Sequence, residues 1–132
     1  MDDELEAIRR KKMEELKSGA GKGAQWPNEP VVVTDADFDA FVAKYPLVVI
    51  DCWAPWCGPC RMVAPVVDAL SKELAGKAVF GKLNTDENPS IPNKFNISAI
   101  PTLLVFKGGK LADRIIGAMP KDQLGAKIKK HL

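Results

Sequence analysis

The chain has 132 residues, of which 46% are hydrophobic and 27% charged. This is ordinary usage for one globular domain, and it excludes a two-domain enzyme with its own cofactor domain. Nineteen Lys and Arg nearly balance 17 Asp and Glu, for a formal net charge of +2, so a nucleic-acid partner is not expected. The three cysteines, Cys52, Cys57 and Cys60, fall in one short segment. Such a cluster indicates a chemical site rather than a framework of structural disulfides.

Residues 1–25 read as a unit separate from the rest of the chain. Residues 2–17 place apolar side chains on one helical stripe, and a glycine-rich linker follows them (Leu5, Ile8, Met13 and Leu16; residues 18–24). Acidic and basic residues cancel here, which favours a solvated helix docked loosely on the domain over a partner-binding arm. The acidic start lacks the apolar core of a signal peptide, and no apolar run approaches the ~18 residues of a membrane span. We therefore expect a cytoplasmic protein with no membrane contact.

From Trp26 onward, apolar runs alternate with helical periodicity. The unbroken aliphatic content of the second run indicates a strand buried on both faces. The expected elements are a strand at 31–33, a helix capped near Thr34 or Asp35, a strand at 47–54, a helix from Cys57 to Gly76, a strand at 78–84, a short helix starting near Pro89, strands at 102–106 and 110–116 joined by Gly108-Gly109, and a last helix from Pro120. This order, β-α-β-α-β-α-β-β-α, predicts an α/β fold with a central mixed sheet flanked by helices, parallel at first and antiparallel at the last hairpin.

The segment Cys57-Gly58-Pro59-Cys60 lies where the buried strand ends and a helix begins. A helix N-terminus presents unsatisfied N–H donors and partial positive charge, which favours the thiolate, the nucleophilic form of cysteine. The two-residue spacing keeps Cys60 within bonding reach of Cys57. The pattern predicts a dithiol that exchanges reversibly with disulfides of other proteins.

Trp56-Cys57-Gly58-Pro59-Cys60 resembles the active-site motif of the thioredoxin family, and the resemblance extends over residues 31–132. It implies a thioredoxin domain at 26–132 and a protein-disulfide reductase in which Cys57 attacks and Cys60 resolves the mixed disulfide. Asp51 stands in the place of the family's buried carboxylate, which would take the proton from Cys60, and Lys82 in the place of the lysine beside it. The resemblance also implies a cis-proline at Pro101 and an apolar substrate surface (Trp56, Gly58, Pro59, Ile100, Pro101, Gly117 and Ala118).

The same resemblance predicts the partners. Substrates would be proteins that contain disulfides, and a separate reductase would supply electrons because the chain has no nucleotide-binding glycine motif. We expect a monomer with no resident cofactor. Gly58-Pro59 between the cysteines is the pair found in reducing members of the family, whereas a disulfide-forming oxidant or isomerase, the alternative on this fold, commonly carries a histidine there.

Some of these residues have a second interpretation. Asp51 and Lys82 could form a buried structural pair without a role in proton transfer.

Cys52 departs from the aromatic residue usual in the family. Strand alternation predicts that it is a buried, inert side chain rather than a regulatory thiol. The spacing of the cysteines copies three ligands of an iron–sulfur cluster, but a fourth cysteine is missing and His131 is the only histidine, so no metal site is expected.

Overall fold

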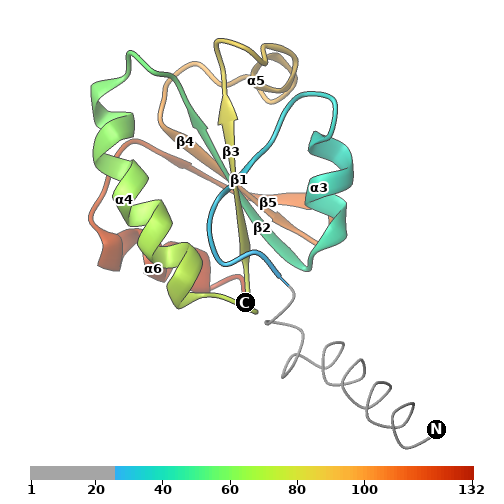
Figure 1. Ribbon diagram of the computed structural model, residues 1–132, viewed down its shortest axis with the longest axis vertical. Helices are drawn as coiled ribbons and strands as arrows, with labels where there is room; N and C mark the ends of the chain where they lie inside the picture. The colour runs from blue at the N-terminus through green and yellow to red at the C-terminus, as the bar shows by residue number, and fades with distance from the viewer. Residues whose placement is uncertain (1–25) are drawn as a thin grey trace, which may run out of the picture.

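The computed structural model describes residues 26–132, so the helix and linker predicted within residues 1–25 lie outside the described part. One five-stranded sheet runs in the order β1-β3-β2-β4-β5, where the strands are β1 (Val31–Val32), β2 (Leu47–Trp53), β3 (Val79–Asn84), β4 (Thr102–Lys107) and β5 (Lys110–Ile116). The helices of this part are α3 (Phe38–Lys44), α4 (Gly58–Glu73), α5 (Ser90–Lys94) and α6 (Lys121–Lys129). In Figure 1, α4 and α6 cover one face of the sheet and α3 lies against the other. None of these helices is long and apolar enough to cross a membrane.

The strand β2 lies at the centre of the sheet, as its aliphatic run predicts. It pairs in parallel with β3 and antiparallel with β4, so the antiparallel part of the sheet begins one strand earlier than the last hairpin. The physical reason is the position of α5, which sits at the end of the sheet where β3 finishes (Figure 1). The chain enters β4 from that same end, and β4 must then run opposite to β2.

Side chains of β2 alternate between two apolar cores. Val49 packs toward α4 and α6, in a core that includes Val67 and Leu103. Val48 and Ile50 pack toward α3, with an aromatic group of Phe38, Phe95 and Phe106. This period of two places Asp51 and Cys52, which are neighbours in β2, on opposite faces of the sheet.

The helix α3 begins later than the sequence indicates, at Phe38 with Asp37 as its N-cap residue. The carboxylate of Asp35, expected to cap it, instead accepts hydrogen bonds from the backbone N–H groups of Ser90 and Ile91, at 2.9 and 3.0 Å. Those two donors are the first turn of α5. A tertiary contact across 55 residues has therefore taken the capping side chain, and it ties the segment after β1 to the short helix beside the site.

Candidate functional site

The two cysteines of the motif lie at the end of the central strand and the start of the longest helix of the described part. Cys57 is the N-cap of α4, and its Sγ accepts a hydrogen bond of 3.2 Å from the backbone N–H of Cys60. The two cysteines are joined by a disulfide, with their Cα atoms 5.3 Å apart. Both side chains are nearly buried, at 4% and 3% exposed. The helix N-terminus thus directs an N–H donor at Cys57 Sγ, which stabilises negative charge on that sulfur when the disulfide is reduced.

A second segment reaches the dithiol from the loop before β4. The Ile100–Pro101 peptide bond is cis, as the family resemblance implies, and the Ile100 carbonyl oxygen lies 3.7 Å from Cys57 Sγ. Two hydrogen bonds hold the segment in place. Gly117 N–H donates to the Pro101 carbonyl at 2.8 Å, and the Thr102 hydroxyl donates to the Ala99 carbonyl at 2.5 Å. The structure therefore brings three chain segments to one sulfur pair.

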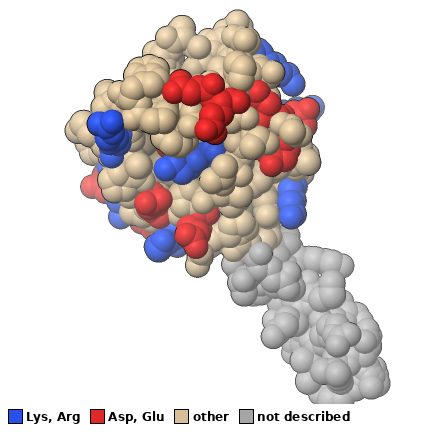
Figure 2. Space-filling view, turned by 45° about the horizontal axis from the view of Figure 1, so that its top comes forward, with Lys and Arg blue, Asp and Glu red and all other residues tan. Residues whose placement is uncertain are grey.

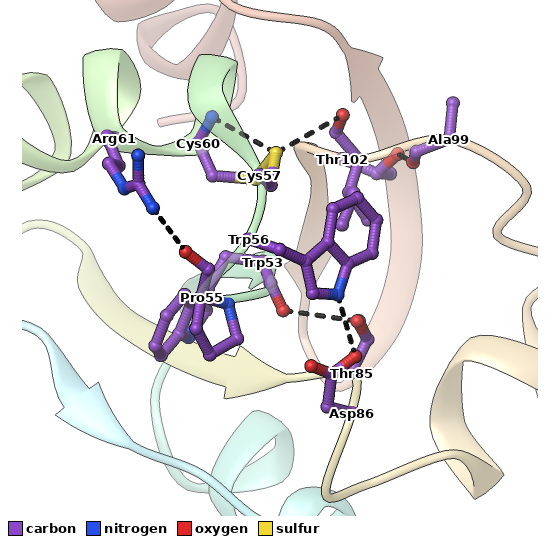
Figure 3. The surroundings of a disulfide bond; sticks show 11 residues. Trp53, Pro55, Trp56, Cys57, Cys60, Arg61, Thr85, Asp86, Ala99 and Thr102 are labelled. Atoms are coloured by element: carbon purple, nitrogen blue, oxygen red, sulfur yellow. Dashed lines mark hydrogen bonds between the residues drawn. A yellow bond between two sulfur atoms is a disulfide. The ribbon is translucent and has the colours of Figure 1, made fainter.

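The surface beside the dithiol is largely uncharged. Trp56 is 67% exposed, and its indole N–H donates to Asp86 Oδ1 at 3.2 Å, which fixes the ring over the loop after β3 (Figure 3). A hollow of about 200 Å³ lies between this ring and the segment from Ile97 to Ile100. The lining of this hollow carries no charged side chain, whereas on the face drawn in Figure 2 acidic side chains gather in the upper part and basic ones are scattered. An extended polypeptide can be held on such a surface by backbone and apolar contacts with little dependence on its sequence.

Asp51 lies beneath the disulfide, 1% exposed, and its Oδ1 has no hydrogen-bond partner. Burial raises its pKa from 3.8 to about 6, while the nearby charge of Lys82 lowers it and that of Asp68 raises it. Lys82 is the register partner of Asp51 on β3, but its Nζ lies 5.2 Å from the centre of the Trp53 ring. No ion pair joins it to Asp51 within residues 26–132. Asp51, Lys82 and Cys60 instead line one cavity of about 110 Å³, which is large enough for ordered water.

Cys52 is separated from this chemistry. It is 0% exposed and packs in the apolar core on the α3 side of the sheet, as strand alternation predicts. Burial, followed by the neighbouring charge of Asp51, raises the pKa of its thiol to about 12. A thiol in this environment stays protonated and does not react at neutral pH.

Sequence reasoning missed three residues that shape the site. Asp86 holds the Trp56 ring, Thr102 holds the loop of Pro101, and the Arg61 guanidinium donates to the Pro55 carbonyl at 2.8 Å (Figure 3). Asp86 carries no sequence signal, because its partner is set by how loops meet at one end of the sheet. Thr102 lies in the segment Ile100-Pro101-Thr102, which resembles the family's cis-proline segment, but its hydrogen bond was not predicted. The one signal for Arg61 is its place directly after Cys60.

Known proteins share this family and this fold. The family model described as Thioredoxin matches residues 29–130. Thioredoxin from Synechocystis is 51% identical over 102 residues, which cover 76% of this chain and 94% of that protein. The chloroplastic thioredoxin M-type of Pisum sativum is 50% identical over 107 residues, covering 80% of this chain but only 62% of the pea protein. A solved structure, a mutant thioredoxin from Halobacterium salinarum, matches with a TM-score of 0.76 at 30% identity, covering 80% of this chain and 93% of that one.

These matches and the dithiol define a class, the proteins that exchange disulfides through a Cys-Gly-Pro-Cys pair on this sheet. The chain belongs to the thioredoxin family. It is a protein-disulfide oxidoreductase that acts by dithiol–disulfide exchange through Cys57 and Cys60.

Proposed function

We propose that Cys57 is the attacking thiolate and Cys60 the resolving thiol in the reduction of protein disulfides. The observation that supports this order is the asymmetry of the two sulfurs. Cys57 Sγ receives an N–H donor at the helix start, whereas Cys60, and not Cys57, lines the cavity that contains Asp51. The first position stabilises a thiolate, and the second offers a proton acceptor.

The exchange then proceeds in two balanced steps. Cys57 thiolate attacks one sulfur of the substrate disulfide, the substrate S–S bond breaks, and the other substrate sulfur leaves as a thiolate that takes a proton from water. Cys60 then loses its proton and attacks the Cys57 sulfur, which releases the second substrate thiolate. Two electrons pass to the substrate, and the Cys57–Cys60 pair is left oxidised.

We assign the proton from Cys60 to Asp51, directly or through water in the shared cavity. A carboxylate with a pKa of about 6 is ionised at neutral pH yet basic enough to accept a proton transiently. Lys82 limits the rise in that pKa. The alternative, a structural Asp51–Lys82 pair, is less well supported because Lys82 packs over Trp53 and Asp51 Oδ1 has no partner.

The substrate polypeptide is proposed to lie across the apolar surface around Cys57. Ile100 would pair with substrate backbone beside the sulfur, since its carbonyl is already 3.7 Å from Cys57 Sγ. The remaining contacts would come from the neighbouring rim (Trp56, Gly58, Pro59, Pro101, Gly117 and Ala118). Backbone pairing and apolar contact carry little sequence information, which suits a reductant of many proteins.

The wider setting of the reaction is also a proposal. A separate reductase would return electrons to the disulfide, and the protein would act as a monomer in a reducing compartment such as the cytoplasm. Residues 26–132 would be the catalytic domain, and the family match at 29–130 supports this boundary.

A trapping experiment tests the assigned order of the cysteines. Cys60→Ser keeps the attacking thiolate but removes the resolving thiol, so mixed disulfides with substrate proteins should accumulate and be released by a reducing agent. Cys57→Ser is the matched control, and it should trap nothing. Equal trapping by the two variants, or trapping by Cys57→Ser alone, would show that the order is wrong.

A further inference from the structure

The cavity beneath the disulfide runs from buried to exposed side chains. Its inner lining includes Asp51 and Cys60, which are 1% and 3% exposed. Its lining also includes Pro55 and Arg61, both of which are exposed. The cavity therefore connects the unpartnered carboxyl oxygen of Asp51 with the outside of the molecule.

One hydrogen bond joins the two exposed residues of this lining. Arg61, in the first turn of α4, donates from Nη2 to the carbonyl oxygen of Pro55, in the loop after β2, at 2.8 Å. Figure 3 shows the guanidinium reaching from the helix toward that loop. Hydrogen bonds from a charged donor are stronger than neutral ones. The contact ties together two of the chain segments that line the cavity.

We propose that Arg61 is a positioning residue that closes the outer wall of the Asp51–Cys60 cavity through its hydrogen bond to Pro55, and so limits the entry of bulk water. This inference rests on the proposed function, in which Asp51 takes the proton from Cys60. Arg61 touches neither the substrate nor a reacting sulfur in this scheme. Its effect passes through the hydration of Asp51.

The surroundings of Asp51 determine the direction in which its pKa should move when Arg61 is removed. Lys82 faces it from β3 and Asp68 and Cys60 from α4, while β4 contributes the apolar Leu103. Burial is the largest cause of its raised pKa, ahead of the charges of Lys82 and Asp68. Admitting water weakens the burial effect and lowers the pKa of Asp51 toward 3.8. If Arg61 acted instead as a nearby positive charge, its removal would raise that pKa.

The test is a titration of the Asp51 carboxyl, followed by carbon NMR in the full-length oxidised protein. Arg61→Ala should shift the midpoint downward by about one unit, a tenfold change in the ionisation constant. Arg61→Lys keeps a donor and should restore at least half of the shift. Lys72→Ala removes a charge of the same sign from an exposed position of α4 and should leave the midpoint in place. An unchanged or raised midpoint in Arg61→Ala would overturn the proposal.

A second readout separates this inference from the function on which it rests. The rate at which Cys60 resolves a preformed mixed disulfide is measured in single turnover across the pH range of the titration. If the Asp51 midpoint moves to lower pH in Arg61→Ala and the pH profile of the resolution rate moves to lower pH with it, the role of Arg61 and the role of Asp51 as proton acceptor are both supported. If the midpoint falls while the resolution profile does not move, Arg61 does close the cavity and the assignment of Asp51 as proton acceptor is wrong.

Discussion

Replacing Asp51 by Asn should stabilise the folded protein relative to the wild type increasingly as the pH rises. The Asp51 carboxyl is buried without a partner for Oδ1, and its pKa rises from 3.8 to about 6 on folding. An acid with a raised folded-state pKa binds its proton more tightly in the folded than in the unfolded chain. Its contribution to stability is therefore complete below pH 3.8 and is lost as the pH rises through about 6.

The size of the effect follows from the pKa difference. At ~1.4 kcal/mol per pKa unit, ionising this buried carboxyl costs the wild-type protein about 3 kcal/mol of unfolding free energy at pH 7. Asn carries no charge at any of these pH values, so the variant does not lose this amount. The difference in unfolding free energy, variant minus wild type, should grow by about 3 kcal/mol between acid and neutral pH, whatever its value at acid pH.

The assay is urea unfolding of the oxidised wild type and the Asp51→Asn variant at a series of pH values from below 4 to above 7. The increase with pH in the difference in unfolding free energy reports only the ionisation of Asp51. Changes in packing and hydrogen bonding caused by the amide contribute equally at every pH. Asp122→Asn, which removes an exposed carboxyl from α6, controls for the loss of one negative charge. A difference that stays constant or shrinks as pH rises would refute the view that burial dominates at Asp51.

Further predictions concern the fold and the third cysteine. Gly81→Ala should destabilise the domain by roughly 1–3 kcal/mol, because a Cβ there would come within 2.7 to 2.9 Å of three core side chains; denaturant unfolding measures this, and a stability equal to wild type would contradict it. Asp35→Ala removes two hydrogen bonds at the start of α5 and should cost about 1–2 kcal/mol, with faster amide exchange at Ser90 and Ile91 as the local sign. In the reduced native protein, Ellman's reagent should react at Cys57 and be displaced by Cys60, so that two equivalents of its thiolate are released promptly as the Cys57–Cys60 disulfide forms. Cys52 should react only on unfolding, since it is fully buried and has no partner thiol; prompt release of three equivalents would show that the core around it opens.

Local patterns were sufficient to predict most of the elements. The aliphatic run of β2, the glycine pair before β5 and the prolines before α5 and α6 each act on their own backbone, through burial or restricted φ. Gly108 and Gly109 do adopt positive φ, at 61° and 83°, which a two-residue hairpin turn requires. Strand alternation also placed Asp51 and Cys52 on opposite faces, because that period of two is a property of the strand alone.

Only the tertiary structure decided where side chains find their partners. Asp35 has the sequence position of a cap for α3 but caps α5, because the loops after β1 and β3 meet at one end of the sheet. The direction of β4 was set in the same way, by the place of α5. Each of these depends on contacts between segments far apart in the chain, and such contacts leave no periodic signal in the sequence.

In the site, too, some features were determined by the sequence and others only by the tertiary structure. The sequence by itself determined the dithiol and the start of the helix beside it, since the first of the two cysteines lies at a strand-to-helix junction and is the N-cap of α4. It did not determine the surroundings of Asp51. Three features depend on how β2, β3 and α4 enclose one small cavity. They are the packing of Lys82 over Trp53, the absence of a hydrogen-bond partner for Asp51 Oδ1, and the contact of Arg61 with Pro55. The spacing of residues places a side chain on an element, but the shape of the space around it is decided by every element that packs there.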